Sequence, residues 1–510
     1  MKQQLFKNSL SGVIQFVLTA GLALISIPIF ISHLGSETYG VFATTSVIGN
    51  LAIFANLGLN SSLIKFIAEQ GKSKESDFDI IVSLIIVIVM LLPLTFISLY
   101  FEKGIIINVL NVPKIQFDTV KILYRFLLVS NFILFSGNIM GAILSARQKT
   151  YTLNYIQLVY SILYWGLIIT TILLGYNLKE IGLVILIATI VWFGLIIYFS
   201  IKEWGSIPKF SGLVANFKRI AKKQLGYGYQ IYLAGLITFL YEPLTKILIA
   251  NFIGIQEVGF FEIALKIRGY VISIISKAMQ PLFPLFSEIT ETSKLRLLVH
   301  DVTQKALFLS LPLIIIIIYC TFPFISIWLN HDVAIISISV ISIAGVYLIT
   351  VTSTPNFLFL MSKDLAKKTI YIQLINVVVN SIVILTLFKT MGYYAVIIGN
   401  IVAILCAFSL NIFYQHRYLQ SLIFDSRRQL INFILSALIL LFIGFCLNKF
   451  ITVNLIKLIV IPLGVFISCL LLYRHFSLIT EVDINRYFYK DNEIKKKLKS
   501  FFIKYPVYKS

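Results

Sequence analysis

Runs of about 20 apolar residues recur along the whole of this 510-residue chain and limit its fold more than any other feature. A run of that length crosses a hydrocarbon core of roughly 30 Å as an α-helix. The sequence lacks the polar–apolar alternation that is typical of strands in a membrane barrel. Composition agrees, because 58% of the residues are hydrophobic and only 13% are charged. We therefore predict an all-α, polytopic membrane protein.

We expect about 14 transmembrane helices, of which six form a first repeat, six a second repeat and two follow at the C-terminal end. The expected spans are 9–32, 41–67, 80–101, 118–143, 152–174, 181–201, 227–252, 257–285, 302–329, 333–360, 370–389, 393–414, 430–447 and 453–473.

A short motif occurs twice and indicates the repeat. Gly35 and Gly40 in the first copy match Gly254 and Gly259 in the second, at an offset of about 219 residues. Each copy lies between two apolar segments, so we expect each to form a tight hairpin in which glycine lets the chain leave one helix and enter the next. Six spans per repeat is an even number. We therefore expect two six-helix lobes in parallel orientation, related by an axis along the membrane normal.

Basic residues concentrate in one alternate set of connections, which predicts that both termini lie in the cytoplasm. The net charge of +21 is mostly this topological signal, and no nucleic-acid partner is expected because no soluble domain surrounds the basic segments. The predicted parts are an N-terminal lobe at 1–201, a cytoplasmic linker at 202–226, a C-terminal lobe at 227–414, the last two spans in 415–473, and a basic cytoplasmic tail at 474–510 that rests on anionic lipid.

Ionisable residues inside the spans mark the candidate site, because each costs roughly 2.5–3.5 kcal/mol at the bilayer centre unless it is hydrated or paired. The candidates are four cations and two carboxylates: Arg268, Lys246, Lys266, Arg125, Glu242 and Glu262. Each carboxylate precedes one of the lysines by four residues, so the partners share a helix face. No carboxylate lies four residues from Arg268 in the sequence.

Two interpretations of this set stay open. The charges form internal salt bridges that fix helix packing, or they line a hydrated, net-cationic cavity between the lobes that receives an anionic headgroup. In the second interpretation the four cations bind substrate, and Glu242 and Glu262 are candidates for coupling to an ion. Pro28 and Pro243 interrupt the first helix of each repeat and are candidate hinges.

The remaining motifs indicate no catalytic or metal-dependent chemistry. The cysteines and histidines form no ligand cluster, so neither a metal nor another cofactor is expected. Asp77-Phe78-Asp79 has the Asp-x-Asp form that binds metal–nucleotide sugars, but we assign it to a short, solvated charged loop between two spans.

Several short motifs in a fixed order resemble the polysaccharide transporter family of the multidrug/oligosaccharidyl-lipid/polysaccharide flippase superfamily. They are Asn8-Ser9, Leu34-Gly35 with Tyr39-Gly40, Asn56-Leu57-Gly58-Leu59, and Ile253-Gly254 with Val258-Gly259-Phe260. The resemblance implies a flippase of the bacterial inner membrane that moves undecaprenyl-diphosphate-linked oligosaccharide repeat units, such as those of O-antigen in lipopolysaccharide biosynthesis, by alternating access. It also implies membrane lipids, a polysaccharide polymerase and the chain-length machinery as partners.

Two other functions are weighed against this one. A drug/cation antiporter of the same superfamily usually has twelve spans and a carboxylate-rich first lobe, whereas the charges here are mainly positive and two extra spans are present. A membrane glycosyltransferase or polymerase usually carries a substantial outer catalytic loop, and every outer connection predicted here is short. We therefore expect a transporter and not an enzyme.

Overall fold

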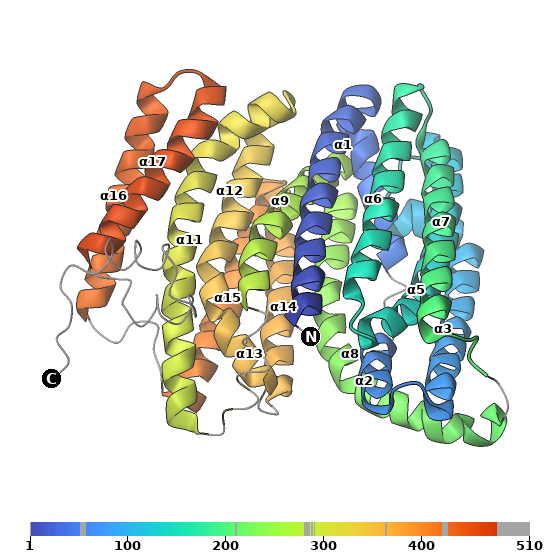
Figure 1. Ribbon diagram of the computed structural model, residues 1–510. Coiled ribbons are helices and arrows are strands. Elements are labelled where there is room, and N and C mark those ends of the chain that lie inside the picture. Colours follow the sequence, from blue (N-terminus) through green and yellow to red (C-terminus); the bar gives the residue numbers. More distant parts are fainter. Residues whose placement is uncertain are drawn as a thin grey trace. The chain divides into compact units, whose positions relative to one another are not determined.

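The computed structural model describes residues 2–50, 58–209, 212–279, 286, 289, 291–362, 365–420 and 427–476. These residues form helices joined by short turns and include no strand, which confirms the all-α class (Figure 1). Asn56 of the family motif and the tail beyond residue 476 lie outside the described residues. The helices are α1 (Lys2–Asn50), α2 (Leu59–Gln70), α3 (Lys74–Tyr100), α4 (Glu102–Gly104), α5 (Phe117–Ala146), α6 (Thr150–Leu173), α7 (Leu178–Trp204), α8 (Leu213–Phe252), α9 (Ile255–Met279), α11 (Thr292–Trp328), α12 (Val333–Thr350), α13 (Thr354–Ser362), α14 (Ala366–Met391), α15 (Tyr394–Leu419), α16 (Arg427–Phe450) and α17 (Asn454–His475).

Eleven segments of the described chain are long and apolar enough to cross a membrane, so the protein is a multi-pass membrane protein. The expected count of fourteen is not confirmed. The described residues of the expected span 41–67 are divided between α1 and α2. The span 227–252 lies in α8 and the described part of 257–285 lies in α9, and both helices carry several ionisable side chains.

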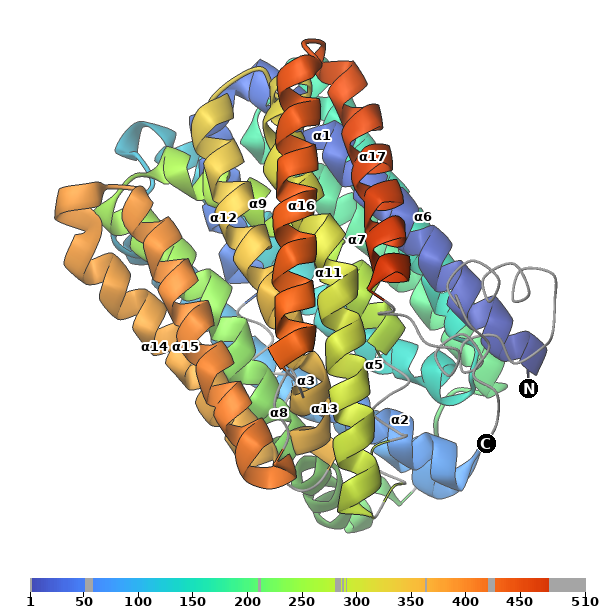
Figure 2. The same ribbon diagram turned by 90° about the vertical axis from the view of Figure 1, so that its left-hand side faces the viewer.

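The chain divides into two compact units, Met1–Ile263 with Ala366–Ala407, and Ala264–Leu365 with Phe408–Ser510. In the first unit, α5 packs along α7, α1 along α6, and α14 along α8 (Figure 1). In the second unit, α11 packs against α12 and α17, and α16 and α17 form an antiparallel pair (Figure 2). The predicted lobe boundaries stay a prediction.

The core of the first unit depends on close approach between α5 and α7. Trp192 and Trp204 are buried there among the aliphatic side chains of α2, α3 and α5. A Cβ at Gly137 would lie 2.5 Å from the Trp192 ring, so only glycine lets the indole pack directly on the α5 backbone. The sequence Gly137-Asn138-Ile139-Met140-Gly141 therefore serves helix packing.

The first hairpin motif divides α1 into two helices that meet at Gly35. This residue has φ 84° and ψ 159°, a conformation that side chains other than glycine rarely adopt. In the second copy, only Ile253 and Gly254 separate α8 from α9. The second glycine of each copy, Gly40 or Gly259, lies inside the following helix and not in the turn.

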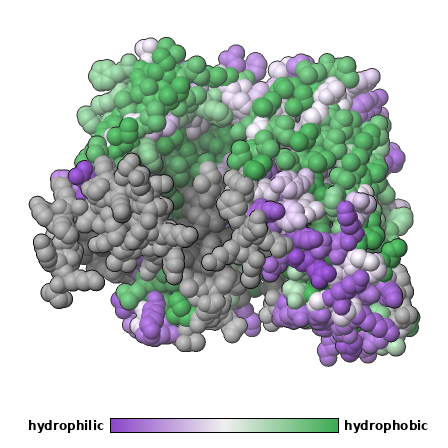
Figure 3. All heavy atoms as spheres, viewed as in Figure 1, coloured by the Kyte–Doolittle hydropathy of each residue, from purple (hydrophilic) through white to green (hydrophobic). Residues whose placement is uncertain are grey.

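The linker predicted at 202–226 contains the end of α7 and the start of α8, which continues without a break into the next span. Its basic residues bind the first unit. Arg219 donates two hydrogen bonds to Glu75, at 2.8 and 2.7 Å, and Lys223 lies 2.8 Å from the buried Asp79. Figure 3 shows hydrophilic residues gathered at this end of the unit, around α2 and the start of α8.

The interpretation of Asp77 and Asp79 as part of a solvated loop is wrong. Both lie in the first turns of α3 and are 8% and 0% exposed. Asp77 accepts a hydrogen bond from Trp204 Nε1 at 2.7 Å and one from the Lys209 backbone N–H at 3.2 Å. The carboxylates therefore attach the linker and the end of α7 to α3, a structural role.

Candidate functional site

A buried ion pair inside the first unit joins the two helices that flank the second hairpin. Lys246 Nζ of α8 lies 2.5 Å from Glu262 Oε2 of α9, and the two side chains are only 8% and 17% exposed. The sequence spacing predicts pairs within each helix, but the bond observed here crosses between helices. A buried charge is costly unless it is paired, so each residue offsets part of the burial cost of the other.

The pairing follows from the short turn between α8 and α9. Lys246 lies six residues before the end of α8, and Glu262 lies seven residues after the start of α9. At 1.5 Å per residue, both side chains start roughly 10 Å from the hairpin. The hairpin therefore sets the two residues at the same depth, where they face each other.

Tyr39 of the first hairpin packs directly on α9, one helical turn before Glu262. A Cβ at Gly259 would lie 3.3 Å from Tyr39 Cδ1, so the absence of a side chain at Gly259 makes room for the ring. Tyr39 is 2% exposed and its ring contacts that of Phe30 edge to face, at 5.4 Å. The first hairpin thus covers the ion pair on the side that faces the turn between α8 and α9.

The two hairpins touch each other, and we call this region the hairpin contact. Gln256 Nε2 donates a hydrogen bond to Ser36 Oγ at 3.0 Å. A Cβ at Gly40 would collide with the Ile255 carbonyl oxygen, so no other residue fits there without a shift of the backbone. The four hairpin glycines therefore have separate roles, since Gly35 and Gly254 form the breaks and Gly40 and Gly259 allow the helices to approach.

The loop before α5 extends the hairpin contact along α8. Asn111 Nδ2 donates to the Ala250 carbonyl oxygen at 2.6 Å, and Asn251 Nδ2 donates to the Val109 carbonyl oxygen at 2.5 Å. Asn111 has a positive φ of 50°, which asparagine tolerates better than most residues. Side-chain amides thus bond backbone carbonyls in both directions, so the two repeats are joined on this side of the first unit.

Buried polar side chains surround the α8 end of the ion pair. Asn380 of α14 donates to Thr245 Oγ1 at 2.7 Å, and Asn400 of α15 donates to the hydroxyl of Tyr241. Both asparagines are almost fully buried, and their Oδ1 atoms accept no hydrogen bond from any described residue. A buried polar atom left without a bond costs about 1–3 kcal/mol, so this cluster is not optimised for stability.

The remaining candidates on α8 and α9 lie further from the turn between these helices than the ion pair does. Glu242 is one turn before Lys246 and is half-buried. Lys266 and Arg268 follow Glu262 on α9 and are also half-buried, on the part of that helix that belongs to the second unit. Their assignment to a substrate cavity stays a prediction.

Arg125 binds a carboxylate that the sequence spacing did not reveal. Its guanidinium donates to both oxygens of Glu102, at 2.8 and 2.7 Å, and Lys121 Nζ lies 3.4 Å from the same carboxylate. The hydrogen bond from Arg125, together with the charges of Arg125 and Lys121, lowers the pKa of Glu102 despite its burial. Arg125 is 53% exposed, and a role in substrate binding stays a prediction.

The prolines do not break their helices. Pro28 lies inside α1 and Pro243 inside α8, and both helices continue past them. A proline removes one backbone hydrogen bond and so leaves a point of weakness. Their role as hinges stays a prediction.

Sequence reasoning missed Asn380, Asn400 and Thr245. A signal was present, because asparagine inside an apolar span is itself unusual and expensive unless it is bonded. Rules based on charge alone pass over such residues. For the described residues, no group of three or more metal-binding side chains was found.

Comparisons with known proteins agree with this architecture. The model of a family described as polysaccharide biosynthesis protein matches residues 5–290, more than half of the chain. An uncharacterized membrane protein of Methanocaldococcus jannaschii, MJ1375, is 24% identical over 423 residues, which cover 80% of this chain and 97% of the relative.

Two solved structures share the fold at low sequence identity. A lipid II flippase, MurJ, in an inward closed conformation has a TM-score of 0.68 at 17% identity and covers 95% of this chain and 99% of its own. A multidrug resistance transporter of the MATE family, in an inward-facing conformation, has a TM-score of 0.63 at 16% identity and covers 80% of this chain and 99% of its own. The chain therefore shares the fold of these two transporters.

Proposed function

This chain belongs to the family of polysaccharide biosynthesis proteins, and from that premise we propose that it is a membrane flippase. Its substrate is an oligosaccharide repeat unit linked to undecaprenyl diphosphate, a precursor of O-antigen or a related surface polysaccharide. It carries this lipid from the cytoplasmic to the outer leaflet of a bacterial inner membrane, with both termini in the cytoplasm.

The observation that carries the proposal is the buried pair of Lys246 and Glu262. A diphosphate crosses hydrocarbon only if a cation replaces the water around it, since an unpaired charge there is expensive. Lys246 is such a cation, and Glu262 is its counter-ion while substrate is absent. The arriving diphosphate displaces Glu262, so that Lys246 keeps an anionic partner throughout.

The pair also lies where a conformational change would act on it. The hairpin contact is about two helical turns away from the ion pair, and Tyr39 connects the two by packing on α9 one turn from Glu262. Separation of the hairpins removes Tyr39 from Gly259 and uncovers the pair. Alternating access would then consist of opening the hairpin contact, with bending at Pro28 and Pro243, and closure on the other side of the membrane.

The remaining cations extend the path for the anion. Lys266 and Arg268 continue along α9 and attract the diphosphate before and after it meets Lys246. The sugars pass through the hydrated space between the lobes, and the polyprenyl tail stays in the lipid. The translocation forms and breaks no covalent bond, so the chain acts as a transporter and hands its cargo to a polysaccharide polymerase and the chain-length machinery.

A drug/cation antiporter is the competing function, and the charge of Lys246 separates the two. A cavity for cationic drugs requires carboxylates, and a lysine there repels the substrate. Under that function, Lys246→Met leaves drug efflux unchanged or raises it. Under the flippase function, it stops glycan export.

The proposal is tested in cells whose own copy of this gene is deleted. Plasmid-borne wild type restores the surface glycan, whereas Lys246→Met restores none and leaves lipid-linked repeat units in the inner leaflet. The control is Lys222→Met, at an exposed residue of α8 that makes no hydrogen bond or ion pair with any described residue. Normal surface glycan with Lys246→Met at wild-type abundance contradicts the proposed role of the pair.

A further inference from the structure

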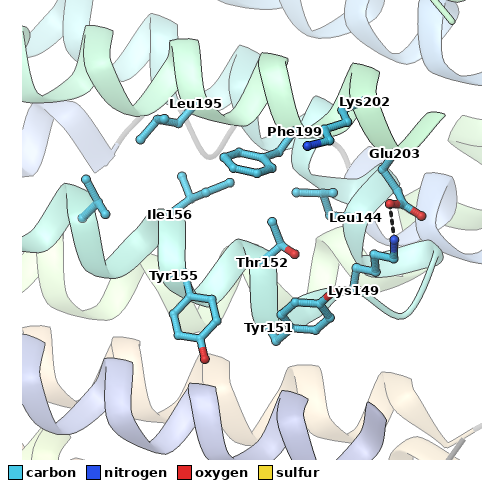
Figure 4. A pocket seen from close by; sticks show the side chains of 11 residues that line it. Leu144, Lys149, Tyr151, Thr152, Tyr155, Ile156, Leu195, Phe199, Lys202 and Glu203 are labelled. Carbon is cyan, nitrogen blue, oxygen red and sulfur yellow. Dashed lines mark hydrogen bonds and ion pairs between the residues drawn. The ribbon is translucent and has the colours of Figure 1, made fainter. Parts of the chain in front are cut away.

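A cavity of about 470 Å³ opens on the surface of the first unit, between α5, α6 and α7 (Figure 4). Its wall is apolar, formed chiefly by Leu144, Ile156, Val159, Leu195 and Phe199. Val159 is 42% exposed, so the apolar space is open to the surroundings of the helices. The volume falls within the range of about 300–1,000 Å³ that is usual for ligand pockets.

One end of the cavity is polar and carries an excess of positive charge. Lys149 Nζ lies 2.5 Å from Glu203 Oε2, so these two charges compensate each other. Lys202 is exposed, and its ammonium lies 5.8 Å from the centre of the Tyr198 ring. Among the described residues no ion pair of Lys202 is found, so the polar end has a net charge of +1.

We propose that this cavity binds an anionic glycerophospholipid. One acyl chain lies in the apolar part, and the phosphate lies against Lys202, with the Thr152 hydroxyl close by as a hydrogen-bond donor. The Lys149–Glu203 pair closes the end of the site and fixes α6 against α7. The ligand thus has the same polarity as the cavity, apolar along its length and anionic at one end.

The surroundings of the cavity favour a lipid over a soluble anion. Tyr155, Ile190 and Tyr198 are exposed on α6 and α7, and Figure 3 shows largely apolar surface over these helices. A surface of this kind is covered by acyl chains in a membrane. A soluble anion would meet one lysine that is already paired with Glu203 and one further lysine, and such an exposed arrangement binds an anion only weakly.

The polar end of the cavity lies at the depth expected for a lipid headgroup. Lys149 belongs to the turn between α5 and α6, and Lys202 lies in the last turn of α7. Under the proposed orientation these ends lie in the cytoplasmic leaflet, where anionic lipids attract juxtamembrane lysines by about 1 kcal/mol each. The lipid would link the ends of α6 and α7, next to the contact that Asp77 and Trp204 make between α3 and α7.

Binding is measured with the full-length protein in detergent, by native mass spectrometry titrations with phosphatidylglycerol and phosphatidylcholine. We expect wild type to prefer phosphatidylglycerol. Lys202→Ala reduces the apparent affinity for phosphatidylglycerol about fivefold and leaves that for phosphatidylcholine unchanged. The matched control Lys222→Ala, which removes an exposed lysine elsewhere, binds as wild type does.

A second pair of variants tests the apolar part. Val159→Trp fills the cavity and weakens both lipids, whereas Val191→Trp, at an exposed residue of α7 outside the cavity, weakens neither. If Val159→Trp does not fold, Lys202→Ala alone decides, since it changes only an exposed side chain.

Three results overturn the assignment. If Lys202→Ala and Lys222→Ala lose affinity for phosphatidylglycerol equally, the lysines attract anionic lipid in general and form no specific site. Competition by glycerol 3-phosphate at the same concentration as phosphatidylglycerol identifies a site for soluble anions. Displacement by undecaprenyl phosphate at lower concentration than phosphatidylglycerol identifies the substrate lipid as the occupant. Because none of these readouts uses export, the lipid site and the flippase function fail independently.

Discussion

Replacing Lys246 by methionine removes the cation of the buried pair while keeping a side chain of similar length. Two unit charges 2.5 Å apart attract each other by about 7 kcal/mol at an effective dielectric constant of about 20. Desolvation of the two ions, several kcal/mol each, offsets most of that gain. The intact pair therefore adds little net stability, but replacing Lys246 takes from the largely buried Glu262 the cation that lies 2.5 Å away. We expect Lys246→Met to lower the free energy of unfolding by about 3–5 kcal/mol.

The double variant Lys246→Met with Glu262→Met separates packing from transport. Both charges vanish together, so the free energy of unfolding should return to within about 1 kcal/mol of wild type. If the pair serves only helix packing, export returns as well. If Lys246 binds the diphosphate, export stays absent although the protein is stable.

Stability is measured by denaturant unfolding of the purified protein in detergent, and export by the amount of surface glycan in the deletion strain. Both variants are compared at equal abundance in the membrane. A double variant that exports normally refutes the role of Lys246 in substrate binding. A single variant as stable as wild type refutes the electrostatic reasoning.

Three further perturbations test other parts of the molecule. Cysteines at positions 36 and 256, where Ser36 Oγ and Gln256 Nε2 now lie 3.0 Å apart, should form a disulfide that stops export until it is reduced. Export by the fully crosslinked protein would show that the hairpins do not separate. Arg268→Ala should abolish export while the abundance of the protein in the membrane stays normal. Arg268→Lys should keep part of the export, because lysine keeps the charge but not the bidentate geometry that suits phosphate. Normal export by Arg268→Ala would remove Arg268 from the substrate path. The hydrogen bond from Arg125 lowers the pKa of Glu102 in the folded protein from its ordinary value of 4.5. The contribution of Glu102 to stability is therefore complete above the pKa of the unfolded chain, and it is lost as the pH falls through the lower pKa of the folded protein. Glu102→Gln should remove this part of the acid sensitivity in unfolding experiments, and an unchanged pH profile would contradict it.

The membrane class and the repeated hairpin were predictable because they depend on local sequence. A run of apolar residues determines a membrane helix almost alone. Gly35 and Gly254 mark breaks that the chain makes within a few residues. The roles of Gly40 and Gly259 were not predictable, because they depend on which backbone approaches them from the other repeat.

The partner of Lys246 was not predictable from spacing along one helix. Glu262 lies sixteen residues away, on the next helix, and only the two-residue turn brings it to the same depth. The i,i+4 rule describes isolated helices and does not account for a neighbouring helix that offers a better partner.

The assignment of Asp77 and Asp79 failed although the sequence held a signal. Ser73 caps α3 by accepting a hydrogen bond from the Ser76 backbone N–H, and acidic residues follow in the first turn. This pattern is typical of a helix start. Hydropathy placed the start of the span near residue 80, because charged residues in the first turns of a membrane helix have the hydropathy of a solvated loop.

Transport by the purified protein in liposomes tests the central claim most directly. A fluorescent undecaprenyl-diphosphate oligosaccharide is placed in one leaflet, and its appearance in the other is followed with a quencher that does not cross the bilayer. We expect transport by wild type and none by the double variant Lys246→Met with Glu262→Met. The variant with cysteines at positions 36 and 256 should transport only after its disulfide is reduced. Equal transport by wild type and the stable double variant would contradict the role of Lys246 as the cation that receives the diphosphate.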